Sequence, residues 1–139
     1  SSDLSVKFLS TFFTSIIEER GQLSAYELDA RKFRPRRIYT IDSVPENMSR
    51  GAHAHKELSQ YIVALKGKFS ITVVDRSLVE CSVEIKSEGP GIYLEPCTWR
   101  ELHSFSTDAI CLVFASLPYD QEDYIWCKDE FETYAKTRN

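Results

Sequence analysis

The sequence predicts an all-β protein with a short helical tail. Most of the chain consists of short segments rich in β-branched and aromatic residues, which recur about every ten residues with turn signals between them. That pattern is typical of a β-sandwich or a β-barrel. The last part of the chain carries aromatic residues at spacings of three or four, which indicates a helix. A length of 139 residues fits one domain, and we expect a single domain over residues 1–139.

Strand and turn signals divide the chain in order. The glycine in residues 18–21 and the glycine and proline residues of 87–91 predict turns, and Pro45 lies in a loop over residues 42–49. The segment 37–41 alternates, which places Arg37 and Tyr39 on one face. The expected strands cover residues 6–17 (one or two strands), 22–28, 37–41, 61–66, 69–75, 79–86, 92–95, 99–105 and 110–116.

The C-terminal segment predicts one or two amphipathic helices. Residues 120–124 are acidic, as helix starts often are. Tyr124, Cys127, Phe131 and Tyr134 then follow at helical spacing.

Composition excludes several classes of function. An apolar content of 42% and a charged content of 27% are those of a globular protein. The net charge of −4 argues against nonspecific binding to nucleic acid. No apolar run approaches the roughly 18 residues of a membrane span, and residues 1–17 lack a signal-peptide pattern. The four cysteines show no C-x-x-C pair, so we expect free thiols and a cytoplasmic protein.

The segment 50–67 contains the strongest candidate for chemistry. His53 and His55 are one residue apart, and in a strand both side chains point to the same face. Gly51 precedes them, Gln60 follows after four residues, and Gly67 after six more. Because the pKa of histidine lies near neutrality, such a pair can act as acid and base.

This spacing resembles the first signature of the cupin superfamily, whose fold is a jelly-roll β-barrel. The cupin pattern has a glutamate where this chain has Gln60, and in metal-binding cupins that carboxylate and the two histidines hold a divalent metal. A neutral amide is a poorer ligand, so we expect no metal and no other cofactor.

A longer series of motifs resembles one cupin family, the dTDP-4-keto-6-deoxyglucose 3,4-ketoisomerases (FdtA-like and WxcM-like sugar-nucleotide isomerases). The likeness covers nearly the whole chain. The matching segments are Glu19 to Leu23, Arg37 to Tyr39, Arg50 to Lys56, Gly91 to Leu94, Trp99 to Ser106, Leu112 to Ser116, and Tyr119 to Ile125.

The resemblance implies isomerisation of dTDP-4-keto-6-deoxyglucose to a dTDP-3-keto-6-deoxyhexose through an enediol, in deoxysugar and amino-sugar biosynthesis. It implies catalysis by His53 and His55, with either one as the base. It also implies a homodimer, a downstream aminotransferase, and a product destined for a lipopolysaccharide O-antigen or an S-layer glycan.

Five residues are expected to bind the substrate. Tyr39 lies on the inward face of its strand and can hydrogen-bond a sugar oxygen, whereas Arg20 and Arg50 match arginines that would bind the pyrophosphate. Gln60 follows the histidine pair and either contacts the sugar or satisfies a buried hydrogen bond. Arg100 faces the opposite side of its strand from His103, and we place Arg100 in the cavity.

Arg100 is a departure from many relatives, which have histidine after the tryptophan. An arginine can stabilise an enediolate oxygen but does not shuttle protons at pH 7. The product is therefore either the gluco or the galacto 3-keto sugar. Thr40, where relatives often have a second tyrosine, is a smaller departure.

Three other functions are compatible with the sequence. They are a metal-dependent cupin oxygenase, in which Glu57 or Glu101 replaces the missing carboxylate; a nucleotide-sugar 3,5-epimerase; and a sugar-nucleotide binding module without catalysis.

Overall fold

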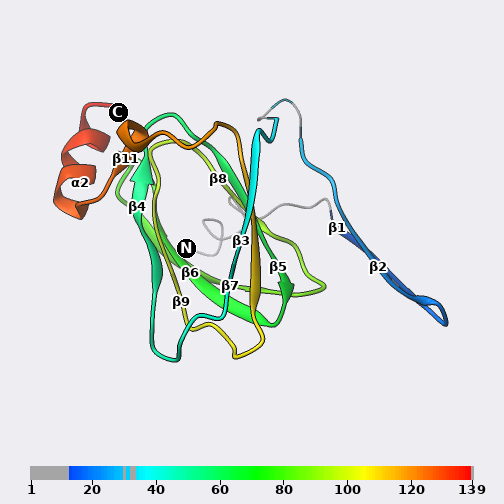
Figure 1. Ribbon diagram of the computed structural model, residues 1–139. Coiled ribbons are helices and arrows are strands. Elements are labelled where there is room, and N and C mark those ends of the chain that lie inside the picture. Colours follow the sequence, from blue (N-terminus) through cyan, green and yellow to red (C-terminus); the bar gives the residue numbers. More distant parts are fainter. Residues whose placement is uncertain (1–12, 30, 32–33, 139) are drawn as a thin grey trace.

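The protein folds into two stacked antiparallel sheets with one C-terminal helix, so the all-β prediction is confirmed (Figure 1). The computed structural model describes residues 13–29, 31 and 34–138. The strands are β1 Phe13–Glu18, β2 Gly21–Tyr26, β3 Arg37–Asp42, β4 Arg50–His55, β5 Gln60–Lys66, β6 Lys68–Val74, β7 Glu80–Lys86, β8 Ile92–Leu94, β9 Trp99–His103, β10 Ile110–Ala115 and β11 Tyr124–Ile125. A 3₁₀ helix, η1, spans Gln121–Asp123, and α2 spans Lys128–Lys136.

Each sheet contains strands that are distant in the sequence. One sheet has the order β3-β10-β5-β8 and the other the order β11-β4-β9-β6-β7. The strands β1 and β2 form a separate hairpin, which extends beyond the two sheets in Figure 1. Its Gln22 side chain donates a hydrogen bond to Glu88 at the end of β7, at 2.5 Å.

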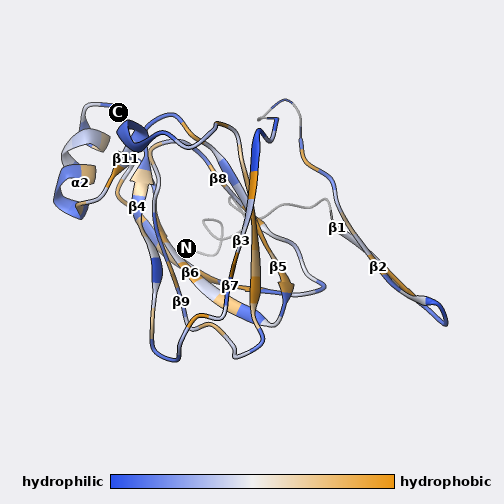
Figure 2. Cartoon of the chain, viewed as in Figure 1, coloured by the Kyte–Doolittle hydropathy of each residue, from blue (hydrophilic) through white to orange (hydrophobic). Residues whose placement is uncertain are grey.

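The main core fills the space between the two sheets. Its members alternate along their strands with more exposed residues, as in β6, where Phe69, Ile71 and Val73 are buried. Apolar stretches recur along the strands of both sheets (Figure 2). Cys111 belongs to this core, and burial raises the pKa of its thiol to about 12. That environment makes Cys111 a packing residue and a poor nucleophile.

A second, smaller core lies between α2 and the outer face of the sheet that contains β4 and β9. Phe131 and Ala135 of α2 are buried there with Ala54 and Trp99. Because side chains alternate along a strand, burial of Ala54 and Trp99 on this face sends their neighbours His53, His55 and Arg100 to the other face. The helix thereby fixes which residues line the interior.

The C-terminal segment differs from the prediction. The acidic stretch begins a helix, since Asp120 accepts a hydrogen bond from the Glu122 N–H at 3.0 Å, but that helix is the single 3₁₀ turn η1. Tyr124 and Ile125 then pair with His55 and Ala54 of β4. The predicted C-terminal helix is confirmed as α2, which contains Phe131 and Tyr134 but begins only at Lys128. Tyr124 and Cys127 come before it, because the open edge of β4 takes up the backbone of Tyr124 and Ile125 as a strand.

The remaining boundaries agree closely with the predictions. The segment expected at 22–28 is β2, and the expected strand at 92–95 is β8. Most of the strand region expected at 6–17 lies outside the described residues. Within the described part of the chain, no helix is long and apolar enough to cross a membrane.

Candidate active site

A bulge in β4 positions the histidine pair. The pairing of β4 with β9 shifts register between Arg50 and His53, and Gly51 has a φ of 72°. A side chain at Gly51 would be strained at this φ, and its Cβ would lie 3.3 Å from Leu102 Cδ1. After the bulge, His53 lies directly across from Arg100 of β9. Directly opposed residues share a face, so the imidazole and the guanidinium project into the same space.

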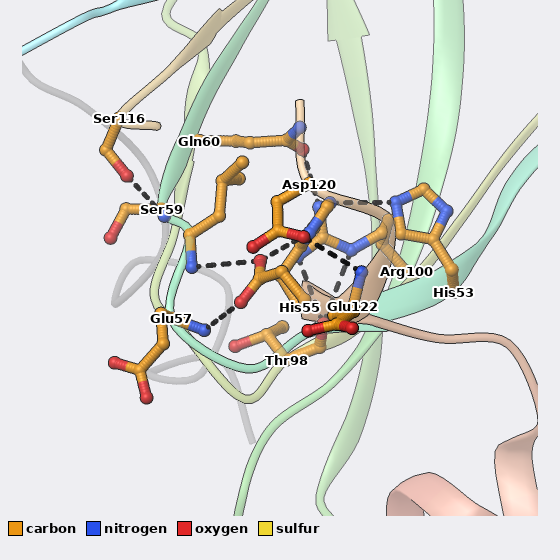
Figure 3. Close-up of polar contacts among 12 residues, drawn as sticks. His53, His55, Glu57, Ser59, Gln60, Thr98, Arg100, Ser116, Asp120 and Glu122 are labelled. Carbon is orange, nitrogen blue, oxygen red and sulfur yellow. Dashed lines mark hydrogen bonds and ion pairs between the residues drawn. The ribbon is translucent and has the colours of Figure 1, made fainter. Parts of the chain in front are cut away.

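The two histidines contact each other and differ in access. Their Nε2 atoms are 3.1 Å apart, and their rings meet edge to face at 89° (Figure 3). His53 lines a pocket between the sheets, whereas His55 lies behind it and is 0% exposed. Burial, followed by the charge of Arg100, lowers the pKa of His53 to about 3. His53 is therefore neutral at pH 7.

His55 is held by a carboxylate on its other side. Its Nδ1 lies 3.0 Å from Asp123 Oδ2, and the two side chains are 1% and 6% exposed. Burial, then the charges of Arg100, His53 and Arg37, lower the pKa of His55. The Asp123 carboxylate opposes these effects, because a nearby negative charge favours the protonated ring.

Arg100 is a buried cation that forms no direct ion pair with any of the residues that the structure describes. It is 1% exposed, and its guanidinium donates to Gln60 Oε1 at 2.5 Å and to the Thr98 carbonyl at 3.0 Å (Figure 3). Both acceptors are neutral, and none of the ion pairs in the described part of the chain includes Arg100. Burial lowers its pKa to about 10, so it remains charged at pH 7.

The opposite sheet supplies Tyr39 and Gln60. The hydrogen bond from Arg100 identifies the oxygen of the Gln60 amide, so its NH₂ group must face Tyr39, to whose hydroxyl it donates at 3.1 Å. The Tyr39 oxygen is thereby an acceptor from Gln60, and its own O–H remains able to donate to a ligand. Burial is the main cause that raises the pKa of Tyr39, which keeps that proton in place at neutral pH.

These side chains surround a pocket of about 310 Å³. His53, Arg100, Tyr39 and Gln60 contribute from the interior, and Arg37 and Arg50 also line it. Tyr124 and Trp126 add an aromatic wall, with their rings stacked 4.6 Å apart at 8°. The pocket therefore offers a neutral imidazole, a phenol and three arginines to one ligand.

The structure brings together most, but not all, of the residues predicted from the sequence. His53, Tyr39, Arg50, Gln60 and Arg100 line the pocket, and His55 supports it from behind. Arg20 lies instead at the exposed turn of the β1–β2 hairpin, where it pairs with Glu18 at 2.8 Å. A role for Arg20 toward the substrate therefore stays a prediction, since it lies outside the pocket of its own chain.

The orientation predicted for β9 is confirmed. Arg100 faces the pocket, whereas His103 hydrogen-bonds Thr72 at 2.8 Å and Ser104 at 2.9 Å. Gln60 satisfies a buried hydrogen bond, one of its two expected roles, and also lines the pocket.

Four residues of the site were missed by the sequence reasoning. Arg37 was placed on the face of Tyr39 but was not assigned a role, and its guanidinium lies 4.7 Å from the Tyr39 ring. Asp123, Tyr124 and Trp126 lie in the segment interpreted as helical. The acidic pattern gave no signal that Asp123 is buried, because its burial depends on β11 pairing with a strand 68 residues away.

The donor set does not fit a divalent metal. Gln60, which stands where a carboxylate ligand would be, gives its oxygen to a guanidinium, and a fixed cation at that point repels a metal ion. The histidine Nε2 atoms are also in contact with each other. In the described ranges 13–29, 31 and 34–138, no group of three or more His, Cys, Asp and Glu side chains is placed to hold a metal ion.

Two antiparallel sheets enclosing a polar pocket with a histidine pair define a cupin-like jelly roll. The chain belongs to the FdtA family: the family described as "FdtA: WxcM-like, C-terminal" matches residues 6–136.

Relatives named for an activity are similar to this chain in sequence, and two of the similar proteins have solved structures. A TDP-4-oxo-6-deoxy-alpha-D-glucose-3,4-oxoisomerase from Aneurinibacillus thermoaerophilus is 37% identical over 123 residues, which cover 88% of each chain. A mutant of the 3,4-ketoisomerase QdtA from Thermoanaerobacterium thermosaccharolyticum, solved in complex with TDP-4-keto-6-deoxyglucose, is similar at a TM-score of 0.83 and 32% identity over 91% of this chain and 92% of that chain. The WlaRB TDP-quinovose 3,4-ketoisomerase from Campylobacter jejuni has a TM-score of 0.78 and 34% identity over 87% and 93% of the two chains.

Proposed function

We propose that the chain is a sugar-nucleotide 3,4-ketoisomerase that converts TDP-4-keto-6-deoxyglucose into a TDP-3-keto-6-deoxyhexose in deoxysugar biosynthesis. The observation that carries this proposal is a neutral histidine beside a cation that has no anionic partner, in one pocket of a member of the FdtA family. The relatives named for this activity support it.

The reaction begins when a base removes the proton on carbon 3. His53 is that base, because it lines the pocket and carries no charge at pH 7. His53 can accept this proton despite its low pKa, because the imidazolium forms beside the negative charge that appears on the sugar, and this charge favours the protonated ring. His55 has no access to the pocket and acts through His53.

The resulting enediolate needs a fixed positive charge near its oxygens. Arg100 supplies this positive charge without a change in its own contacts, because it is already charged and already held by two neutral acceptors, Gln60 Oε1 and the Thr98 carbonyl. Preorganised donors of this kind lose little energy in reorganisation when charge develops. The Tyr39 hydroxyl, which accepts a hydrogen bond from Gln60, donates a hydrogen bond to a second sugar oxygen.

A proton is then delivered to carbon 4, while the hydroxyl proton on oxygen 3 moves to oxygen 4, which leaves the keto group at carbon 3. Because Arg100 does not release protons at pH 7, the carbon-bound proton is returned by the histidine pair, and the face that it reaches decides between the gluco and galacto products. Arg37 and Arg50, which also line the pocket, bind the pyrophosphate of the nucleotide.

We further propose a cytoplasmic homodimer whose product is used by an aminotransferase. A 3-keto group is the substrate that such an enzyme requires, and an amino sugar for an O-antigen or S-layer glycan is the end product. Dimerisation is supported by apolar side chains left exposed on the hairpin and on the neighbouring sheet, namely Ile16, Ile17, Leu23, Ile38 and Leu65. Arg20 lies on this hairpin, so it reaches a pocket only in a partner subunit.

One experiment tests the isomerase assignment. The protein is incubated with TDP-4-keto-6-deoxyglucose in heavy water, and the sugar is followed by NMR. We expect a 3-keto product with deuterium at carbon 4, and solvent exchange at carbon 3 in the 4-keto sugar that remains. Inversion at carbons 3 and 5 would instead identify an epimerase, tight binding without turnover would identify a binding module, and activity that requires stoichiometric iron or manganese would favour an oxygenase-type site.

The dimer is tested separately by sedimentation velocity. We expect one species of twice the chain mass, and Arg20→Ala should weaken TDP binding in that dimer. A monomer with full isomerase activity would contradict both expectations.

A further inference from the structure

Asp123 is a buried carboxylate whose position is fixed by the elements that precede and follow it, η1 and β11. It is the last residue of η1, and the next residue, Tyr124, pairs with His55 across the β11–β4 ladder. Asp120 caps the other end of η1. The Asp123 side chain is 6% exposed and lies outside the pocket, so it cannot touch a substrate.

Three nitrogen atoms contact this carboxylate, and two of them are backbone N–H donors. Oδ1 accepts from the Glu57 N–H at 2.7 Å, and Oδ2 accepts from the Leu58 N–H at 3.3 Å and faces His55 Nδ1 at 3.0 Å. A backbone N–H can only donate, so both oxygens must accept. This arrangement favours the ionised carboxylate, although burial raises the pKa of Asp123.

These contacts determine the proton positions on both imidazoles. An ionised Asp123 requires the proton of neutral His55 to be on Nδ1, which leaves a lone pair on His55 Nε2. The His53 Nε2 atom, 3.1 Å away, must then donate its hydrogen to that lone pair. The remaining nitrogen of His53, Nδ1, consequently has no proton, and it is buried without a hydrogen-bond partner among the described residues.

His53 Nδ1 is on the side of the ring away from His55, next to Gly51, which also lines the pocket. Burial of a nitrogen lone pair without a hydrogen-bond donor destabilises the folded protein, so such an atom calls for an explanation. The explanation offered by this site is that the nitrogen accepts a proton from a bound ligand.

We propose that Asp123 is a positioning residue that sets the tautomers of His55 and His53 and so presents an unprotonated nitrogen of His53 to the substrate. The kinetic part of this inference rests on the proposed isomerase function, whereas the tautomers themselves do not. Asp123 accepts the hydrogen bond from His55 Nδ1 and gives up no proton, and the charge that forms on His53 during turnover is stabilised through His55.

The change Asp123→Asn reverses the arrangement with almost no change in shape. If the amide oxygen keeps the bond from Glu57 N–H, the NH₂ group faces His55 and forces its Nδ1 to accept. His55 then carries its proton on Nε2, and His53 must accept there and hold its proton on Nδ1. The base becomes protonated at the nitrogen that should receive the proton. We expect kcat to fall by about 10²- to 10⁴-fold with KM changed less than about threefold.

Long-range ¹H–¹⁵N NMR of the imidazoles measures the tautomers directly in the full chain. The chain has three histidines, and His103→Gln leaves only the two of interest. At pH 7 we expect Nδ1–H on His55 and Nε2–H on His53, with both reversed in Asp123→Asn. The charged or titratable groups around the pair are Arg100, Arg37 and Tyr124, and Asp120 and Glu57 lie near Asp123. The spectra are therefore recorded over a range of pH.

Asp120→Asn is the matched control. It removes the same charge three residues away but keeps an oxygen that can cap η1, so we expect wild-type tautomers and a kcat within about threefold. A merely structural Asp123 would lower the melting temperature on substitution and leave the tautomers unchanged, which would overturn the proposal. Nε2–H on His55 in the wild type would overturn it even if Asp123→Asn fails to fold. A wild type inactive on the sugar would refute the isomerase assignment and leave the NMR result standing.

Discussion

Replacement of Arg100 by methionine should separate activity from stability. Methionine replaces the aliphatic part of the arginine side chain and carries no charge, and Arg100 is 1% exposed, so the substitution removes a buried cation from an enclosed site. A residue whose purpose is structural lowers stability when it is removed. A cation kept for a developing oxyanion lowers the rate instead, because its burial already costs free energy in the empty protein.

The magnitude follows from the contacts of Arg100. Its pKa falls from 12.5 to about 10, which at about 1.4 kcal/mol per pKa unit is a cost of about 3 kcal/mol for folding with the charge. Methionine removes that cost but leaves Gln60 Oε1 and the Thr98 carbonyl without this donor, at about 1–3 kcal/mol each. The two effects partly cancel, and we expect the free energy of unfolding to change by no more than about 3 kcal/mol. Loss of one preorganised donor should lower kcat by about 10²- to 10³-fold.

Urea unfolding and NMR-monitored turnover measure the two quantities on the same preparation. Arg50→Met is the comparison, since Arg50 also lines the pocket but is exposed. Its proposed contact is with the pyrophosphate, so its loss should raise KM more than it lowers kcat. Arg100→Met with a kcat within tenfold of the wild type, or a loss of activity matched by a large loss of stability, would refute the reasoning.

Further predictions concern the histidines and the packing of the sheets. His53→Ala and His55→Ala should each lower kcat by at least about 10²-fold, and the double variant should lose little more, because the two act as a unit; a fully active double variant would disprove catalysis by the pair. The pKa of His53 is lowered to about 3, so kcat/KM should show no loss near pH 6.5 on the acid side, and an inflection there in a pH–rate profile would contradict a neutral base. In the unfolded chain, His53 binds a proton at a higher pH than it does in the folded protein. Its contribution to the free energy of unfolding should therefore be fully present above about pH 6.5 and be lost as the pH drops toward 3. Urea titrations should find a smaller loss in His53→Asn. Gly91→Ala should cost about 1–3 kcal/mol, measured by urea unfolding, since its Cβ would overlap the Ile62 carbonyl oxygen.

The part of the site that was predictable depends on local geometry. His53 and His55 share a face because side chains alternate in any strand, and the same alternation separates Arg100 from His103. The cation of Arg100 and the neutral amide of Gln60 were also visible in the sequence. Their direct contact was not, since Gln60 and Arg100 come from different sheets and meet only when those sheets stack.

The sequence by itself determined the all-β class, the turns, and the face on which the paired imidazoles lie, because periodicity and turn chemistry act within a few residues. The tertiary structure alone decided that Tyr124 belongs to a strand, that Asp123 contacts His55, and that Arg20 lies away from its own pocket. Each of these outcomes depends on whether a strand edge far along the chain is available for pairing. Free energy gained by pairing that edge outweighs the weak local preference of an acidic segment for helix.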